Sequence, residues 1–315
     1  MEEKGKKGRM DYTLLLIVVL LVVIGLVILY STSAYNGQVK FHDSFYYLKK
    51  QAFATVLGIV LMLFVAGMDY HIWQRLAVFG YLAAVALSVA VMLFGREING
   101  SKRWLALGPF SFQPSEFAKV ALILFLADLV TKNVKTIGKM WTLCRIMFWI
   151  LPIVGLVGAS NLSTAIIILG IGVILIFVAS PKYAQFALMG IAGACFMGIF
   201  LALESYRLER LAIWRNPEKY EKGYQTLQGL YAIGSGGVFG VGIGNSVQKL
   251  GFVPEAQNDM IFSIICEELG LAGAGIIVFL FLLLIWRFFL IASGSRDLFG
   301  ALIATGAMAH MMIQV

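Results

Sequence analysis

The chain begins its apolar sequence with the run Thr13-Leu-Leu-Leu-Ile-Val-Val-Leu-Leu-Val-Val-Ile-Gly-Leu-Val-Ile-Leu-Tyr30, which contains no charged side chain. A hydrocarbon core about 30 Å thick is crossed by roughly 20 helical residues, so this run is long enough to span a bilayer. Backbone groups in lipid must be bonded within the segment, which leaves a helix as the sensible conformation. The run therefore predicts a membrane-spanning helix.

Similar apolar runs recur along the whole chain. Hydrophobic residues make up 60% of it, charged residues 13%, and the mean hydropathy is +0.87, which excludes an ordinary soluble globular protein. We predict an all-α polytopic membrane protein, a single integral-membrane domain over residues 1–315. Its nine expected spans lie at about residues 13–35, 48–67, 73–94, 114–131, 146–159, 161–180, 185–203, 259–286 and 297–315.

The basic residues indicate an orientation. Lys4, Lys6, Lys7 and Arg9 precede the first span, which predicts a cytoplasmic N-terminus and a large extracellular loop at residues 204–258. A cleaved signal peptide is the alternative, although its apolar region would be shorter. The net charge of +8 fits attraction to anionic lipid. No nucleic acid is expected as a partner, because no basic stretch is interleaved with stacking aromatic residues.

One acid stands at the mouth of the eighth span. Asp259 precedes the apolar run that starts Met-Ile-Phe, and a carboxylate there is costly to bury, so it marks a functional site. The dipole of a helix start favours its ionised form, whereas partial burial would raise its proton affinity. Glu267 and Glu268 lie deeper in the same span, eight and nine residues after Asp259. They are expected to form hydrogen bonds between helices instead.

Two further patterns leave alternatives open. Six glycines lie within Gly234–Gly244, without a nucleotide-binding fingerprint, and predict either close backbone packing or a cradle of N–H groups for an anion. Glu116 and Lys119 share a helix face at the start of the fourth span. They form either a structural ion pair or a ligand contact. The three cysteines and three histidines show no spacing typical of a metal centre or a disulfide framework.

Several motifs follow one another in an order that resembles the SEDS family (shape, elongation, division and sporulation), and within it the FtsW/SpoVE branch more than RodA. They cover essentially the whole chain: Gly100-Ser-Lys-Arg-Trp104, Phe112-Gln-Pro-Ser-Glu-Phe-Ala-Lys119, Gly223-Tyr-Gln225, Ala232-Ile-Gly-Ser-Gly-Gly237, Gly240-Val-Gly-Ile-Gly244, Val253-Pro-Glu255, Asp259-Met-Ile-Phe262 and Glu267-Glu-Leu-Gly270.

The resemblance implies a ten-helix enzyme of the bacterial plasma membrane. Such an enzyme polymerises lipid II, an undecaprenyl-diphosphate-linked disaccharide peptide, into peptidoglycan glycan strands during division or sporulation. Expected partners are a class B penicillin-binding protein and divisome proteins. The family's catalytic aspartate falls on Asp259, which would act as the general base at the attacking sugar hydroxyl. The substrate contacts that the resemblance implies are Lys102, Arg103, Trp104, Gln113, Ser115, Glu116, Lys119 and Glu255.

The chemistry of a lipid diphosphate leaving group requires positive charge. Lys102, Arg103, Arg215 and Lys249 are candidates for contacting it. A divalent cation such as Mg²⁺ or Mn²⁺ could do the same through one carboxylate and the substrate phosphates, although no dedicated metal cage is visible.

Two departures from the family pattern stand out. Asn161 lies where many members carry an acid, which removes a charge from that position. The sequence stops at Val315, within the ninth span, so we expect a chain truncated before the tenth helix. Two other functions remain open, a flippase for the lipid-linked precursor and a non-catalytic membrane scaffold. Polar groups gathered in outer loops, without an internal repeat, favour the enzyme over the transporter.

Overall fold

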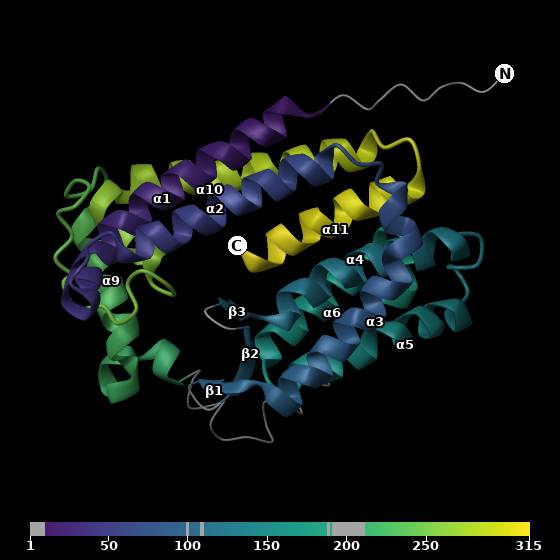
Figure 1. Ribbon diagram of the computed structural model, residues 1–315, viewed down its shortest axis with the longest axis horizontal. Coiled ribbons are helices and arrows are strands. Elements are labelled where there is room, and N and C mark those ends of the chain that lie inside the picture. The colour runs from purple at the N-terminus through teal and green to yellow at the C-terminus, as the bar shows by residue number, and fades with distance from the viewer. Residues whose placement is uncertain (1–9, 99–100, 108–109, 188–189, 191–211) are drawn as a thin grey trace. The chain divides into compact units, whose positions relative to one another are not determined.

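The computed structural model describes residues 10–98, 101–107, 110–187, 190 and 212–315 (Figure 1). The chain forms two compact units. The first contains Met1–Gly67 and Gly193–Leu284, and the second contains Met68–Ala192 and Ile285–Val315. The sequence predicted one domain over the same residues.

The first unit is built on three long helices. Helix α1 (Tyr12–Phe41) packs beside α2 (Tyr46–Ala66), and the first part of α10 (Ile261–Ser293) belongs to the same unit. The side chain of Asp11 accepts a hydrogen bond from Leu14 N at 2.9 Å and so caps the start of α1. Buried apolar residues join α1 to α10, namely Ile28, Ile265, Cys266, Ala274 and Ile277.

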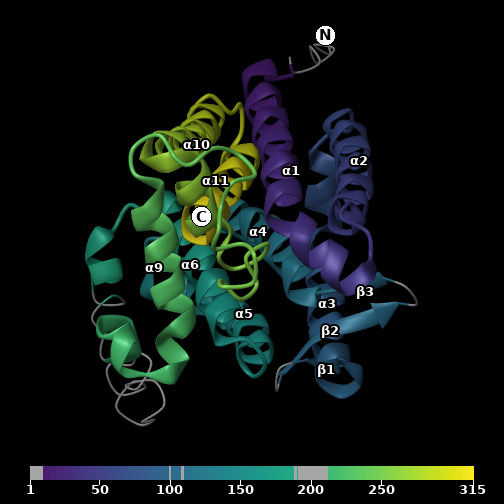
Figure 2. The ribbon, with the colours of Figure 1, turned by 90° about the vertical axis from the view of Figure 1, so that its left-hand side faces the viewer.

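The segment before α10 adds shorter elements to the first unit. Two 3₁₀ turns, η1 (Pro217–Lys219) and η2 (Glu221–Gly223), lead into α9 (Tyr224–Gly236). A loop then runs from Gly237 to Met260, and Figure 2 shows α9 and this loop reaching the start of α10. The described part of the predicted extracellular loop is therefore partly helical.

The second unit surrounds α4 (Pro114–Asn133). It also contains α3 (His71–Phe94), α5 (Met140–Gly158), α6 (Leu162–Ala179), the end of α10 and α11 (Leu298–Gln314). Helix α4 packs against α3, α5, α6 and α11. Its buried side chains, among them Leu122, Leu126 and Val130, supply the centre of the largest apolar core.

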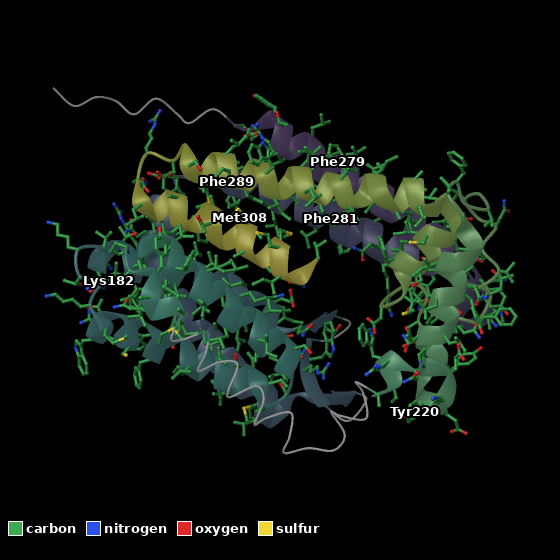
Figure 3. All side chains as sticks on the ribbon, turned by 180° about the vertical axis from the view of Figure 1, so that it is seen from behind. Lys182, Tyr220, Phe279, Phe281, Phe289 and Met308 are labelled. Carbon is green, nitrogen blue, oxygen red and sulfur yellow. The ribbon has the colours of Figure 1, made fainter. Side chains whose placement is uncertain are left out.

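Six of the described helices are long and apolar enough to cross a membrane: α1, α2, α3, α5, α6 and α10. Helix α11 is apolar but shorter, and α4 carries four charged side chains. The aromatic rings of Phe279 and Phe289 on α10 are 57% and 46% exposed, as expected where lipid covers the protein (Figure 3). The prediction of a multi-pass helical membrane protein is confirmed. The expected span at 185–203 lies mostly outside the described residues.

One small sheet was not predicted. Strands β1 (Arg96–Ile98), β2 (Ser101–Leu107) and β3 (Phe110–Phe112) form an antiparallel sheet in which Arg96 pairs with Trp104 and Leu105 with Phe112. Strands β1 and β3, of three residues each, give too few alternating positions for a sequence pattern to reveal the sheet. The polar region that follows α3 is thus a sheet rather than an irregular loop.

Candidate active site

The glycine-rich segment lies against a break in α10. Gly270 has φ 68° and ψ −175°, which interrupts the helix. Val241 N donates to the carbonyl of Glu267 and Gly242 N to that of Glu268, each at 2.9 Å. From the other side of the break, the N–H groups of Leu271 and Ala272 donate to the carbonyls of Gly237 and Val238, each at 3.0 Å. The loop thereby satisfies backbone groups that the break releases.

Glycine is required here because two backbones touch. A Cβ atom on Gly236 would lie 1.9 Å from the carbonyl oxygen of Cys266, and one on Gly240 would lie 2.2 Å from that of Glu268. Of the two alternatives that the sequence left open, close packing therefore explains these glycines without an anion.

Lys249 lies in a buried cluster. Its Nζ is 2.6 Å from Oε1 of Glu268 and donates to Ser31 Oγ at 3.0 Å, while Ser31 donates to Glu268 at 2.7 Å. The side chains of Lys249 and Glu268 are 7% and 3% exposed. The ammonium predicted to contact a substrate diphosphate is thus paired inside the first unit.

Glu267 anchors the same loop one residue earlier. Its carboxylate accepts hydrogen bonds from Ser246 Oγ at 2.5 Å and from Val247 N at 3.1 Å. Ser246 Oγ in turn accepts from Lys249 N at 3.2 Å. The sequence predicted hydrogen bonds between helices for both glutamates. Glu268 makes one, to Ser31 of α1, whereas the partners of Glu267 lie in the loop.

Asp259 ends that loop, two residues before α10 begins. Its side chain is exposed and has no hydrogen-bond or ion-pair partner among the described residues. Nearby, Asn36 of α1 donates to the side-chain oxygen of Gln257 at 2.8 Å. Glu255, with φ 51°, accepts from Asn258 Nδ2 at 2.7 Å. Asp259 is therefore an exposed carboxylate on a tethered loop.

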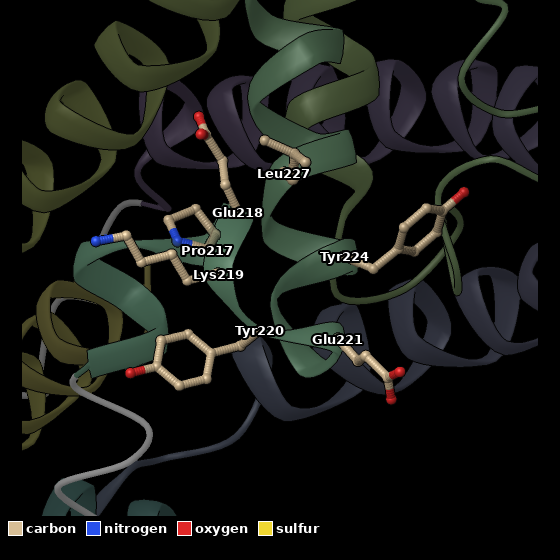
Figure 4. A pocket seen from close by; sticks show the side chains of 7 residues that line it. All are labelled: Pro217, Glu218, Lys219, Tyr220, Glu221, Tyr224 and Leu227. Atoms are coloured by element: carbon tan, nitrogen blue, oxygen red, sulfur yellow. The ribbon is translucent and has the colours of Figure 1, made fainter.

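Arg215 is exposed and precedes a shallow hollow on the first unit (Figure 4). The hollow has a volume of about 520 Å³, and Asp259 is not among the residues that line it. The lining residues are Pro217, Glu218, Lys219, Tyr220, Glu221, Tyr224 and Leu227. The hollow is lined by residues between 217 and 227 and not by the predicted base, Asp259.

The predicted pair at the start of α4 is formed in the second unit. Lys119 Nζ lies 2.9 Å from Glu116 Oε2 and donates to Gln314 Oε1 at 2.7 Å. The Lys119 side chain is 1% exposed, whereas that of Glu116 is 48% exposed. The same oxygen of Gln314 lies 2.5 Å from His310 Nε2. Sequence reasoning missed Gln314 and His310, because the contact between α4 and α11 joins residues far apart in the chain.

The other substrate contacts predicted in the second unit lie before and at the start of α4. Gln113 precedes α4 and is half-buried, and Ser115 is buried with its Oγ unpaired among the described residues. Arg103 is exposed and donates to the carbonyl of Ser160 at 3.1 Å, next to half-buried Trp104. The side chain of Lys102 lies outside what the structure describes.

Asn161 has a local role that explains its amide. It is the N-cap of α6, and its Oδ1 accepts a hydrogen bond from Thr164 N at 3.2 Å. Asparagine and aspartate cap helices about equally well, so the departure from an acid costs little structurally. A negative charge is not needed for this cap.

The predicted site residues thus fall into both units. Glu116 and Lys119 are brought together in the second, and Asp259, Glu255 and Lys249 belong to one loop of the first. Within the described part of the chain, no group of three or more His, Cys, Asp or Glu side chains could hold a metal ion.

Known proteins match this chain along nearly its whole length. The family model described as "Cell cycle protein" for FtsW, RodA and SpoVE matches residues 12–315. Stage V sporulation protein E of Bacillus subtilis is 38% identical, over 98% of this chain and 86% of that protein. A probable peptidoglycan glycosyltransferase FtsW of Trichlorobacter lovleyi is 34% identical, over 96% of this chain and 81% of the relative.

Solved structures match as well. One, described as "Structural coordination of polymerization and crosslinking by a peptidoglycan synthase complex", has a TM-score of 0.79 at 28% identity, covering 97% of this chain and 84% of the other. The rod shape determining protein RodA of Thermus thermophilus has a TM-score of 0.67 at 25% identity, covering 95% and 81%.

Proposed function

This chain belongs to the SEDS family of FtsW, RodA and SpoVE proteins, and on that basis we propose that it is a peptidoglycan glycosyltransferase that polymerises lipid II. Relatives named as glycosyltransferases and a neighbour described as a peptidoglycan synthase complex support the activity. The process that it serves is cell division or sporulation, since its relatives include both FtsW proteins and stage V sporulation protein E.

The reaction is an inverting displacement with Asp259 as general base. A sugar 4-hydroxyl attacks the anomeric carbon of a second, lipid-linked sugar, and its proton passes to the Asp259 carboxylate. The new glycosidic bond forms as the bond to the lipid diphosphate breaks, and the diphosphate leaves with the electron pair. A base accelerates such a step by typically 10²–10⁴-fold.

The departing diphosphate needs positive charge. In the unit that contains Asp259, Arg215 is exposed and can offer a bidentate guanidinium contact, whereas Lys249 is already paired. A divalent cation, Mg²⁺ or Mn²⁺, would neutralise charge on the diphosphate. It would be held by the substrate phosphates and one exposed carboxylate such as Glu255, since no three-ligand group is found among the described residues.

The observation that carries the assignment of the base is the position of Asp259. It is an exposed, unpaired carboxylate within the described residues, on a loop tethered to α1 and α10. Such a group can reach a substrate at the membrane edge. Class B penicillin-binding proteins, which cross-link glycan strands, are the partners that we propose, with other divisome proteins around them.

Asp259→Ala should abolish glycan-strand formation. The assay uses purified lipid II in detergent, with and without a class B penicillin-binding protein, and separates polymer by length. We expect the variant to lose at least about 10²-fold in rate, because no other base replaces the carboxylate.

Asp43→Asn is the matched control, a partly exposed acid on the turn after α1 whose ion pair with Lys49 lies at 2.7 Å. Such surface pairs contribute little, so this variant should polymerise like the parent. Full activity of Asp259→Ala would remove Asp259 from the mechanism. A parent that forms no polymer under any condition would favour the flippase or scaffold.

A further inference from the structure

The ion pair between Lys249 and Glu268 is the most deeply buried one described in the first unit, and a buried pair needs a reason. Taking two charges out of water costs more than a surface pair, and replacing such a pair by apolar groups is often neutral or stabilising. Lys249 and Glu268 are 7% and 3% exposed in their side chains. Fold stability alone is therefore a weak explanation for the pair.

The pair connects α10 to the loop that ends at Asp259. Glu268 lies on α10 just before its break at Gly270, and Lys249 lies in the middle of the loop. Ser31 of α1 bonds to both charged groups, at 3.0 Å to Lys249 Nζ and 2.7 Å to Glu268. Three elements distant in sequence thus meet at one polar point.

Two other contacts fasten the same loop on either side of Lys249. Glu267 holds Ser246 and Val247 N, at 2.5 and 3.1 Å, and Asn36 of α1 holds Gln257 at 2.8 Å. Lys249 is thus the central attachment of a loop whose last residues reach Asp259. Direct contact of Lys249 with substrate is disfavoured, because two of its three N–H donors are used and it is only 6% exposed.

We propose that Lys249 and Glu268 are positioning residues, which fix the loop so that Asp259 is held in place for proton abstraction. This inference rests on the proposed function, in which Asp259 is the base. A hydrogen bond between charged groups is roughly twice as strong as a neutral one, and the buried surroundings strengthen it further, so the pair restrains the loop more than a neutral contact would. Holding a base in place contributes to the rate through orientation, so loss of the pair should lower kcat rather than raise KM.

The test compares the parent with the double variant Lys249→Met/Glu268→Gln, which removes both charges together and leaves neither unpaired. Two quantities are measured: kcat and KM for lipid II, and amide hydrogen exchange of the peptide covering residues 243–258. We expect kcat to fall about 10²-fold, KM to change less than about threefold, and exchange in that peptide to rise about tenfold while α5 and α6 stay unchanged. Removal of the pair Asp128–Lys132 on α4, at 2.6 Å, by Asp128→Asn/Lys132→Met is the control and should change none of these.

A smaller change covers the case in which the double variant does not fold. Ser31→Ala keeps both charges and removes only the bridging hydroxyl, so it should speed exchange in residues 243–258 and lower kcat several-fold. An unchanged exchange rate or an unchanged kcat in the folded variant overturns the inference. A raised KM with kcat retained overturns it too, and assigns Lys249 to substrate binding.

The outcomes separate this inference from the proposed function. If the parent polymerises and Asp259→Ala does not, but the double variant keeps the parent's kcat, the enzyme stands and the positioning role fails. If the parent does not polymerise, the proposed function fails, while hydrogen exchange still shows whether the pair orders the loop.

Discussion

The positively charged residues predicted to belong to the site differ chiefly in burial, and burial decides whether each can contact a ligand. Lys119 and Lys249 are buried and paired, each within its own unit, so their charges are already neutralised by the protein. Arg103 and Arg215 are exposed, so they can meet a charged ligand. Arg103, Arg215 and Lys249 were all expected to contact the diphosphate, because residue type alone does not reveal burial.

The pair of Glu116 and Lys119 leads to an asymmetric prediction. Glu116→Gln leaves the Lys119 ammonium, 1% exposed, without a counter-ion and should cost about 3–5 kcal/mol of unfolding free energy. Lys119→Met leaves a carboxylate that is 48% exposed and remains hydrated, so it should cost only about 1 kcal/mol. Thermal unfolding in detergent measures both. Equal losses, or a larger loss for Lys119→Met, would contradict the burial argument.

For single residues, the sequence predicted where a side chain lies along the chain better than which side chain it bonds. Asp259 was expected at the mouth of a span because polar residues give way to apolar ones there, and it is exposed before α10. Lys249 was expected to face a diphosphate, yet it bonds Ser31, 218 residues away in the chain. A contact of that kind depends on the tertiary fold and leaves no local pattern.

At the scale of elements, the break in α10 and the glycine-rich loop form one device. The break leaves backbone N–H and C=O groups of α10 without helical partners, and the loop forms hydrogen bonds with them. Both segments need glycine because their backbones touch. Sequence identified the glycines as unusual but could not choose between packing and anion binding, since the partner segment was not known. The hydrogen bonds of Val241 and Gly242 decide for packing.

Two glycines of α9 should respond oppositely to alanine. In Gly236→Ala the new Cβ meets the Cys266 carbonyl at 1.9 Å, so the backbone must shift, at a cost of about 3 kcal/mol or more. In Gly234→Ala the Cβ meets nothing within 4 Å, and alanine is the better helix former by about 0.5–1 kcal/mol. Unfolding temperatures of the two variants test this, and a Gly236→Ala protein as stable as the parent would show that the contact is loose.

The turns before α3 and α11 are joined by a hydrogen bond that depends on pH. Tyr70 OH donates to Asp297 at 2.5 Å, and Asp297 also caps α11 by accepting from Gly300 N. This hydrogen bond, with burial second, raises the pKa of Tyr70 to about 12 from its ordinary 10.0. A raised pKa means that the bond's contribution to stability is complete below pH 10 and is lost as pH rises towards 12.

Tyr70→Phe should therefore lower stability by about 1 kcal/mol at neutral pH, discounted for the partial exposure of the pair. The difference from the parent should shrink between pH 10 and 12, the ordinary and raised pKa values of Tyr70. Tyr183→Phe, at an exposed ring, is the control. A difference that stays constant across this range would show that the hydroxyl does not lose its proton there.

At the scale of the whole molecule, long apolar runs were the most dependable signal. Helices α1, α2, α3, α6 and α10 lie where runs were expected, because a span must satisfy its own backbone in lipid. The division into two units was not foreseen, since it depends on which helices pack together. Helix α10 starts in one unit and ends in the other. Predicting the positions of the spans does not reveal such a division.

The orientation of the chain remains to be measured, and it decides on which side the proposed chemistry takes place. Basic residues before the first span predict that residues 204–258 lie outside and that the turn after α4 lies inside. Cys144, Cys195 and Cys266 are first replaced by serine, and single cysteines are then introduced as Asn245→Cys and Lys135→Cys, both at exposed positions.

A membrane-impermeant maleimide applied to intact cells should label the cysteine at position 245 and leave that at 135 unlabelled until the membrane is opened. An external loop would place Asp259 where a flipped lipid II presents its sugars, and any flipping of the precursor would then be a separate, earlier step. The reverse labelling pattern would put the carboxylate on the cytoplasmic side, where polymerised strands could not reach the wall, and the glycosyltransferase proposal would have to be given up.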